Sequence, residues 1–542
     1  MNNKNKKTPF NKSICALAVQ AVGGAAFALA AMPASAFSID TGNPDFAVRW
    51  DNTLKYNLGW RVESQDDTFI NSPGYDSSTL SRDKGDLVTN RIDILSEFDM
   101  VYKDNHGFRV SAAAWNDFEY QDDVEFNPAF GGTPYPNNRF TRDVERYYER
   151  SGEILDAFVF TRIDAGDMPI NIRAGRHNVY WGESLFSFGD SIAYGQGPLD
   201  LRKATSTPGI EAKELFLPQT QLSASMQIND RISVAANYYA EWDPHRLPDG
   251  GTYLGASNVS LLGGQNLGVP YVGDTSRGPN KTPDDKGSWG INTQIRSEML
   301  GGNIGLYYRE FDDRMPTLLL DAANGYAYNA YAEDVKLYGI SYNRLVGAIS
   351  VGAELSRREN AALSSVGFGS QIARGDTWHA LVNMIAYIGA TPVFDSAPLT
   401  AELTYSRLDK VKRSSETAFN HEDYGCTGGI KSGCATDDAW GMNIAFTPTW
   451  FQVFPGIDMT MPINFGYGLK GNSPAPLGAA EGSGSWSVGV EADVHAQYKV
   501  GLAYSDYFGD LVKNDQGQIS GSNGLALLRD RGWVSLTMKT TF

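Results

Sequence analysis

The alternation of apolar and polar residues constrains the fold of this chain more than any other feature. In the segment 46–62 the even positions read Phe, Val, Trp, Asn, Leu, Tyr, Leu, Trp and Val, whereas the odd positions are small, polar or charged. A two-residue period places successive side chains on opposite faces of a β-strand. Because the polar face carries both charge signs, it suits a water-filled or side-chain-filled interior better than a dry core. The segment therefore predicts a wall strand of a membrane β-barrel.

The segment 532–542 has the same alternation and ends on an aromatic residue. This pattern is typical of the signal read by the barrel assembly machinery of bacterial outer membranes, whereas an ordinary edge strand is the alternative. A barrel pairs its last strand with its first, because open strand edges are not tolerated in lipid. We expect 532–542 to pair with 46–62 and the assembly signal to comprise Val534, Leu536, Met538 and Phe542.

Long and short connections alternate between the segments with this period. Long connections such as 63–87 and 121–152 follow odd-numbered segments, and short ones such as 103–106 follow even-numbered segments. Outer-membrane barrels have this asymmetry, with short periplasmic turns and long extracellular loops. The sequence predicts an all-β, transmembrane antiparallel β-barrel of about 16–18 strands, with eighteen the best count. A barrel of this width encloses an aqueous channel unless loops fold into it, so we also expect an inward-folded loop.

The N-terminal residues 1–36 have the features of a cleaved secretory signal peptide. A basic region with four lysines precedes an apolar run, and Ala34-Ser35-Ala36 fits a small-residue cleavage site. The barrel would then occupy residues 37–542, in the outer membrane, in contact with its lipids and lipopolysaccharide. Without 1–36 the chain has 42 basic and 63 acidic residues, a net charge of −21. Such an acidic chain is not expected to bind nucleic acid.

Two cysteines remain beyond the predicted signal peptide. Cys426 and Cys434 flank a glycine-containing segment that can close a short loop. In an oxidising compartment we expect a disulfide between them. Two free thiols are the alternative.

The segment 173–217 fits the strand pattern least, and it mixes charges with aromatic residues and glycines. A charged loop of this kind can fold into a wide barrel, pair with lumen charges and narrow the pore. It would act as a selectivity element, as a brace that stabilises the barrel, or as both. The candidate constriction and lumen residues are Arg173, Arg176, Trp181, Glu183, Arg202, Lys203, Glu211, Lys213 and Glu214.

Two runs in this segment carry a family resemblance. Gly-Arg-x-x-Val-x-Trp-Gly-Glu-Ser (175–184) and Pro-Gly-x-Glu-x-Lys-Glu-x-x-x-Pro (208–218) resemble the outer-membrane family designated domain of unknown function 1302. The opening Trp50 to Tyr56 and the closing Phe542 extend the resemblance over most of the chain. It implies a large outer-membrane barrel. It also implies two partners, a periplasmic protein of the family designated 1329 and an inner-membrane exporter of the resistance-nodulation-division type.

Residues with catalytic or metal-binding potential do not form a convincing site in the sequence. Gly189-Asp-Ser191, together with Asp376 and His379, is similar to blocks of secreted lipases, but the intermediate blocks are missing. Acidic clusters such as Asp122-Asp123 lack the spacing of a calcium hand and suit solvated loops. We expect no catalytic residues, no cofactor and no metal site, and therefore no enzyme.

Three functions remain open from the sequence. The first is transport of a hydrophobic or amphipathic small molecule or lipid across the envelope, with the two implied partners. The second is a general or substrate-selective porin for small polar solutes, for which the acidic composition would favour cations. The third is a surface receptor or structural adhesin.

Overall fold

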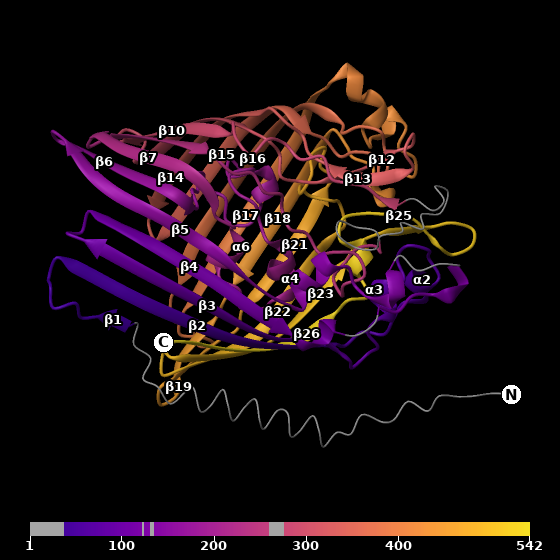
Figure 1. The fold of residues 1–542 in the computed structure, drawn as a ribbon, viewed down its shortest axis with the longest axis horizontal. Helices are drawn as coiled ribbons and strands as arrows, with labels where there is room; N and C mark the ends of the chain where they lie inside the picture. Colours follow the sequence, from indigo (N-terminus) through magenta and orange to yellow (C-terminus); the bar gives the residue numbers. More distant parts are fainter. Residues whose placement is uncertain (1–36, 122–123, 131–134, 259–275) are drawn as a thin grey trace.

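The computed structural model describes residues 37–121, 124–130, 135–258 and 276–542, and the wall of the barrel is its dominant feature (Figure 1). Antiparallel neighbours follow one another around the wall, as the alternating pattern predicts. The eighteen wall strands are β2 (Phe46–Arg61), β3 (Leu87–Tyr102), β4 (His106–Asp117), β5 (Arg150–Ala165), β6 (Met168–His177), β7 (Gln219–Asn229), β8 (Ile232–Tyr239), β10 (Trp289–Ser297), β11 (Gly302–Phe311), β14 (Val335–Val346), β15 (Ile349–Ala362), β16 (Arg374–Ile388), β17 (Ala397–Val411), β18 (Asp438–Phe446), β21 (Ile463–Lys470), β22 (Gly484–Val494), β23 (Tyr498–Phe508) and β26 (Trp533–Thr541).

The first and last wall strands close the barrel. β26 pairs antiparallel with β2 from Thr53↔Thr541 to Arg61↔Trp533. Asn52 and Phe542 extend the ladder, because their backbones exchange hydrogen bonds of 2.7 and 2.9 Å. The predicted pairing of 46–62 with 532–542 and the predicted closed barrel are confirmed. The role of the residues of 532–542 as an assembly signal stays a prediction.

The outer and inner faces of the wall differ in chemistry, as a membrane barrel requires. Many outward side chains are apolar, and Val159, Leu222 and Leu502 expose more than half of their surface, at 58%, 54% and 53%. Inward side chains at alternate positions are polar or charged and buried, for example Lys55 and Glu354. The inner face of the wall is therefore lined by polar and charged side chains. Of the helices within the described ranges, none is long and apolar enough to cross a bilayer.

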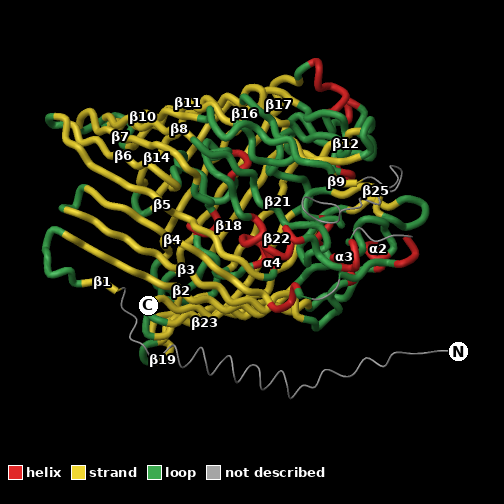
Figure 2. The backbone as a smooth tube through the Cα atoms, viewed as in Figure 1, coloured by secondary structure: helices red, strands yellow, loops and turns green. Residues whose placement is uncertain are grey.

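Short turns gather at one end of the barrel and long connections at the other (Figures 1 and 2). At the short-turn end, β1 (Phe37–Ile39) pairs with β2, and the hairpin of β19 (Thr449–Phe454) and β20 (Ile457–Thr460) lies near the C-terminus. In outer-membrane barrels the end with the short turns is usually the periplasmic one. The long connections hold α2 (Asp67–Ile70), α3 (Ser77–Leu80), η1 (Phe118–Tyr120), η2 (Pro128–Phe130), η3 (Pro136–Asn138), α4 (Arg142–Tyr148), β9 (Ser276–Arg277), β12 (Thr317–Asp321), β13 (Tyr326–Ala330), η5 (Arg413–Ala418), η6 (Glu422–Tyr424), η7 (Ile430–Ser432), β24 (Leu511–Lys513), β25 (Ile519–Ser522) and η8 (Ala526–Leu528).

Two predictions concern the ends and the loops of the chain. The predicted signal peptide, 1–36, lies outside the described residues, so its cleavage stays a prediction. The predicted disulfide is present: Cys426 and Cys434 are bonded, with their Cα atoms 5.8 Å apart, in the long connection between β17 and β18.

A segment bound across the barrel lumen

The connection between β6 and β7, residues 178–218, folds into the barrel and is called the inward segment here. It contains η4 (Phe188–Asp190), α5 (Leu201–Ser206) and α6 (Ala212–Leu215), and Figure 1 shows α6 inside the ring of strands. Gly182 lets the backbone come close to the wall. Its φ is +117°, and a Cβ there would lie 2.5 Å from Oε1 of Glu354. The predicted inward-folded loop is therefore present.

Two carboxylates of the wall bind the first half of the inward segment through its backbone. Glu402 of β17 accepts hydrogen bonds from the N–H groups of Leu185, Phe186 and Ser187, at 2.7, 3.2 and 2.7 Å. Glu354 of β15 accepts those of residues 183, 184 and 192. Hydrogen bonds to ionised acceptors are stronger than neutral ones. These two side chains therefore fix the path of the segment along one side of the wall.

Ion pairs bind α6 to the opposite part of the ring. Glu214 accepts from Lys55 of β2 at 3.3 Å, and both side chains are buried. Glu211 accepts from Lys539 of β26 at 2.5 Å. Lys213 pairs with Glu97 of β3 as well as with Glu211. Because β26, β2 and β3 are neighbours in the wall, these pairs hold α6 over the seam where the barrel closes.

The helix α5 is held by a second group of ion pairs. Lys203 pairs with Glu153 of β5 at 2.8 Å, and Arg202 pairs with Asp249 of a long connection at 2.7 Å. Arg246 completes the group, since it lies 2.7 Å from Glu153 and 3.0 Å from Asp200. Both basic residues of α5 are thus paired with carboxylates of the protein.

The remaining predicted lumen residues of the inward segment also contact the wall. Trp181 is buried in an apolar cluster that includes Ile192 and Tyr194 of the segment and wall residues such as Tyr307 and Leu337. The Glu183 carboxylate accepts from Ser341 and Asn343 of β14, at 3.2 and 2.8 Å. The inward segment thus contacts both halves of the wall, and its role as a brace, as a selectivity element or as both stays a prediction.

Arg176 is a correction to the predicted lumen set. It is opposite Ala157 and Thr220 in the sheet, on the face of β6 that also carries Ile172 and Ala174. There it pairs with Glu241 at 2.7 Å, away from the lumen. The prediction grouped Arg176 with the other charges of 173–217, but β6 runs as a strand to His177, so Arg173 and Arg176 lie on opposite faces of the wall.

Arg173 lies on the inward face of the same strand. Its guanidinium lies over the ring of Phe158, 5.7 Å from the centroid. Among the described residues, none forms an ion pair with it. The other basic residues of the lumen that were predicted for the constriction are paired with carboxylates. The charge of Arg173 therefore remains able to attract an anion.

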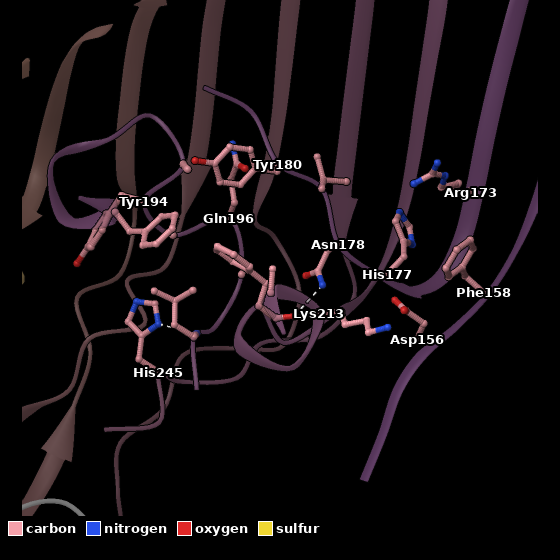
Figure 3. A pocket seen from close by; sticks show the side chains of 18 of the residues that line it. Asp156, Phe158, Arg173, His177, Asn178, Tyr180, Tyr194, Gln196, Lys213 and His245 are labelled. Atoms are coloured by element: carbon pink, nitrogen blue, oxygen red, sulfur yellow. Dashed lines mark hydrogen bonds between the residues drawn. The ribbon is translucent and has the colours of Figure 1, made fainter. Parts of the chain in front are cut away.

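A central cavity of about 400 Å³ lies between the inward segment and strands β4 to β6 (Figure 3). Three aromatic rings of the inward segment, Tyr180, Phe188 and Phe216, meet in edge-to-face contacts with centroids 5.0 to 6.4 Å apart. The wall contributes Phe158 and Arg173. Figure 3 shows Arg173, Phe158 and His177 together at one end of the cavity, and Tyr180, Tyr194 and His245 toward the other.

His245, from a long connection, closes part of the cavity as a neutral ring. Burial, followed by the positive charge of Arg314, lowers the pKa of His245 to about 3. Its Nδ1 accepts the backbone N–H of Leu199 at 3.0 Å, which an unprotonated nitrogen can do. His245 therefore adds no positive charge to the cavity at neutral pH.

Two further cavities share lining residues with the central one. The outer cavity, about 530 Å³, shares Phe188, Leu199 and Leu477 and reaches Gly524 and Leu525 in the long connection before β26. The inner cavity, about 600 Å³, shares residues 178–180 and Arg173, and it reaches Asp104 and Asn105 in the short turn between β3 and β4. The three cavities thus follow one another past the inward segment, from the long-loop end to the short-turn end.

The lipase-like residues are not assembled as a catalytic triad. His379 lies in the lumen, and its two ring nitrogens contact Asp190 and Thr377, each at 2.9 Å. Ser191 donates its hydroxyl proton to the Phe188 carbonyl at 3.0 Å. Asp376 instead faces Arg357. This arrangement gives Ser191 no base.

Glu354, Glu402 and Phe158 are important residues that the sequence analysis did not single out. Each occupies an inward position of a strand whose alternation was recognised, so the signal was present. Glu354 is an isolated acidic residue between Ala353 and Leu355. Its partners are backbone N–H groups far away in sequence, which no local pattern reveals.

The family model described as "Protein of unknown function (DUF1302)" matches residues 17–542. The chain belongs to this family. The resemblance of its two motif runs is thereby confirmed over nearly the whole length. No curated protein matches the chain.

Solved outer-membrane proteins share the barrel fold at low similarity. Pseudomonas aeruginosa OpdK, solved with vanillate, is 9% identical with a TM-score of 0.39, covering 91% of this chain and 98% of that chain. Acinetobacter baumannii OccAB2 is 10% identical with a TM-score of 0.41, covering 94% and 99%. The outer-membrane channel DcaP of Acinetobacter baumannii is 10% identical with a TM-score of 0.36, covering 94% and 100%. Similarities this low carry no information about a substrate.

Proposed function

We propose that this DUF1302 barrel is an outer-membrane channel for a hydrophobic or amphipathic small molecule. The observation that carries the proposal is the succession of three cavities past the inward segment, joined by shared lining residues. The junction between the outer and central cavities is apolar, formed by Phe188, Leu199 and Leu477. A hydrated ion must lose water to pass an apolar junction, and this desolvation costs free energy. A solute with an apolar surface passes more readily, because that surface leaves water favourably.

Blocking the junction between the central and inner cavities tests this function. Val179 lines both cavities, and Val179→Trp is expected to reduce transport about tenfold by filling the narrow part of the route. The measurement is entry of 2-naphthalenesulfonate or (2-naphthyl)trimethylammonium into proteoliposomes. Both probes keep their charge at all pH values, so they cross protein-free membranes slowly.

The matched control is Val159→Trp, which enlarges an outward, lipid-facing valine of β5 and should leave transport unchanged. Entry of at least one naphthyl probe should also exceed that of glucose. If glucose enters faster than both probes, the barrel is a porin for polar solutes. If no solute enters above the protein-free rate, the proposed transport is wrong.

We further propose that a periplasmic protein of the family designated 1329 docks at the short-turn end and links the barrel to an inner-membrane exporter. The family resemblance supports this partner, and so does the β19–β20 hairpin, where Phe451 and Phe454 expose 55% and 62% of their surface. A photo-crosslinking residue at position 454 should capture the family 1329 protein in intact cells. The same residue at outward position 159 is the control, and capture of lipid alone at both positions would contradict the docking.

A further inference from the structure

We infer that the central cavity selects an acidic amphiphile, a small molecule with an aromatic or other apolar body and one anionic group, and that Arg173 binds the anionic group. This inference rests on the proposed channel function and adds the substrate class. It concerns one cationic side chain on the wall and an apolar surface on the inward segment. Neither follows from the fold alone.

The charge of Arg173 is the first support. Arg109 and Lys213 also line the central cavity, but Arg109 forms a two-pronged pair with Asp99 at 2.6 and 2.7 Å, and Lys213 pairs with two glutamates. Among the described residues Arg173 has no ion-pair partner, and its guanidinium lies over the ring of Phe158. Since a guanidinium presents a fork of donors that matches carboxylate, sulfonate or phosphate oxygens, Arg173 is suited to an incoming anion.

The position of Arg173 is the second support. It lines both the central and the inner cavity, so a solute that moves between them passes its guanidinium. Asp156 is the carboxylate in the lining of the central cavity, and its oxygen lies 3.2 Å from the Ser111 hydroxyl, which donates to it. Because Arg109 and Lys213 are paired with carboxylates that lie outside this lining, Arg173 supplies the positive charge in the lining that no carboxylate among the described residues pairs with.

The apolar surface is the third support. Phe158, Tyr180, Phe188 and Phe216 present four rings to a space of about 400 Å³, a volume suited to a small molecule. The Tyr180 hydroxyl is already used, because it donates to the Ser184 carbonyl at 2.6 Å. Rings of this kind bind an apolar body by stacking and exclusion of water.

The two naphthyl probes, which share the apolar body and carry head groups of opposite charge, test the inference. Wild-type protein should pass 2-naphthalenesulfonate faster than (2-naphthyl)trimethylammonium. In Arg173→Gln, sulfonate entry should fall about tenfold while ammonium entry is retained or rises, because one charged hydrogen-bonding partner is lost. Arg173→Lys should restore part of the preference. Methanesulfonate, an anion without an apolar body, should enter more slowly than 2-naphthalenesulfonate.

Arg176→Gln is the matched control, because Arg176 lies three residues further along the same strand on the outward face. It should leave the preference between the probes unchanged. The retained difference in electrophoretic mobility between heated and unheated samples verifies folding of each variant. Equilibrium binding of 2-naphthalenesulfonate to the protein in lipid nanodiscs provides a second readout that does not depend on transport.

The outcomes separate the inference from the proposed function. If both probes enter and Arg173→Gln changes neither the charge preference nor the binding, the assignment of Arg173 is overturned while the channel stands. If neither probe enters but the sulfonate binds in an Arg173-dependent way, the site stands and the channel function fails. If wild-type protein neither binds nor prefers the sulfonate, the substrate class is overturned.

Discussion

Release of the inward segment should convert this barrel into a wide pore. In Glu354→Ala/Glu402→Ala, six backbone N–H groups of the segment lose their acceptors, and each buried unpaired group costs about 1–3 kcal/mol. The first half of the segment should then leave its path along β15 and β17. An eighteen-stranded barrel is wide enough to hold an aqueous channel, so single-channel conductance in planar bilayers should rise about tenfold.

The control for this variant is a lumen carboxylate with a different partner. Glu491→Ala removes a charge from β22, where Glu491 pairs with Lys499 at 3.6 Å, and conductance should change little. Glu354→Gln/Glu402→Gln, which keeps one acceptor oxygen at each site, should fall between wild type and the alanine variant. Unchanged conductance in the alanine variant would mean that the ion pairs of α5 and α6 alone hold the segment in place.

Loss of one buried carboxylate near the barrel seam should have the largest effect on stability. Asp530 pairs with Arg61 at 2.8 Å and with Arg531 at 2.7 Å, and all three side chains are at most 4% exposed. Asp530→Ala would leave two buried guanidinium groups without this partner. We expect the free energy of unfolding to fall by about 3–5 kcal/mol, measured as the fraction that keeps folded electrophoretic mobility after equilibration in urea.

Acidification should reproduce part of this loss in the wild-type protein. Burial by itself raises the pKa of Asp530, but the charges of Arg531 and then Arg61 outweigh it and lower the pKa below the usual value. A depressed folded-state pKa means that the stabilisation is complete above the unfolded-state pKa, about 3.9, and is lost as the pH falls through the folded-state value. Asp530→Asn should therefore lose less stability than wild type between pH 7 and pH 3.

An exposed ion pair at the short-turn end provides the comparison. Asp164 pairs with Arg162 at 3.4 Å with both side chains at least half exposed, so Asp164→Ala should change the free energy of unfolding by less than about 1 kcal/mol. Equal losses for the two alanine variants would show that the cluster around Asp530 does not stabilise the seam.

The sequence alone determined the wall of this protein, because a strand that separates lipid from lumen must alternate apolar and polar residues at every second position. That requirement is local, so the strands and the closure of 46–62 on 532–542 could be predicted from the residues. The disulfide could be predicted as well, from the short spacing of the two cysteines. The fold of 173–217 into the lumen could be expected from its charges and glycines. The opposite faces of Arg173 and Arg176 follow from the same alternation, whereas the contacts of the inward segment with distant strands could not be predicted.

The tertiary structure decided which charges are neutralised and which remain available. Lys213 and Arg173 look equivalent in the sequence, yet one lies against Glu97 and the other over Phe158. The ion pairs of α6 with the wall join residues more than a hundred positions apart, and their geometry depends on the register of the whole ring and on the path of the inward segment. The candidate binding site therefore exists only in the folded barrel, where β5, β6 and the inward segment bring one free guanidinium to the edge of an aromatic cavity.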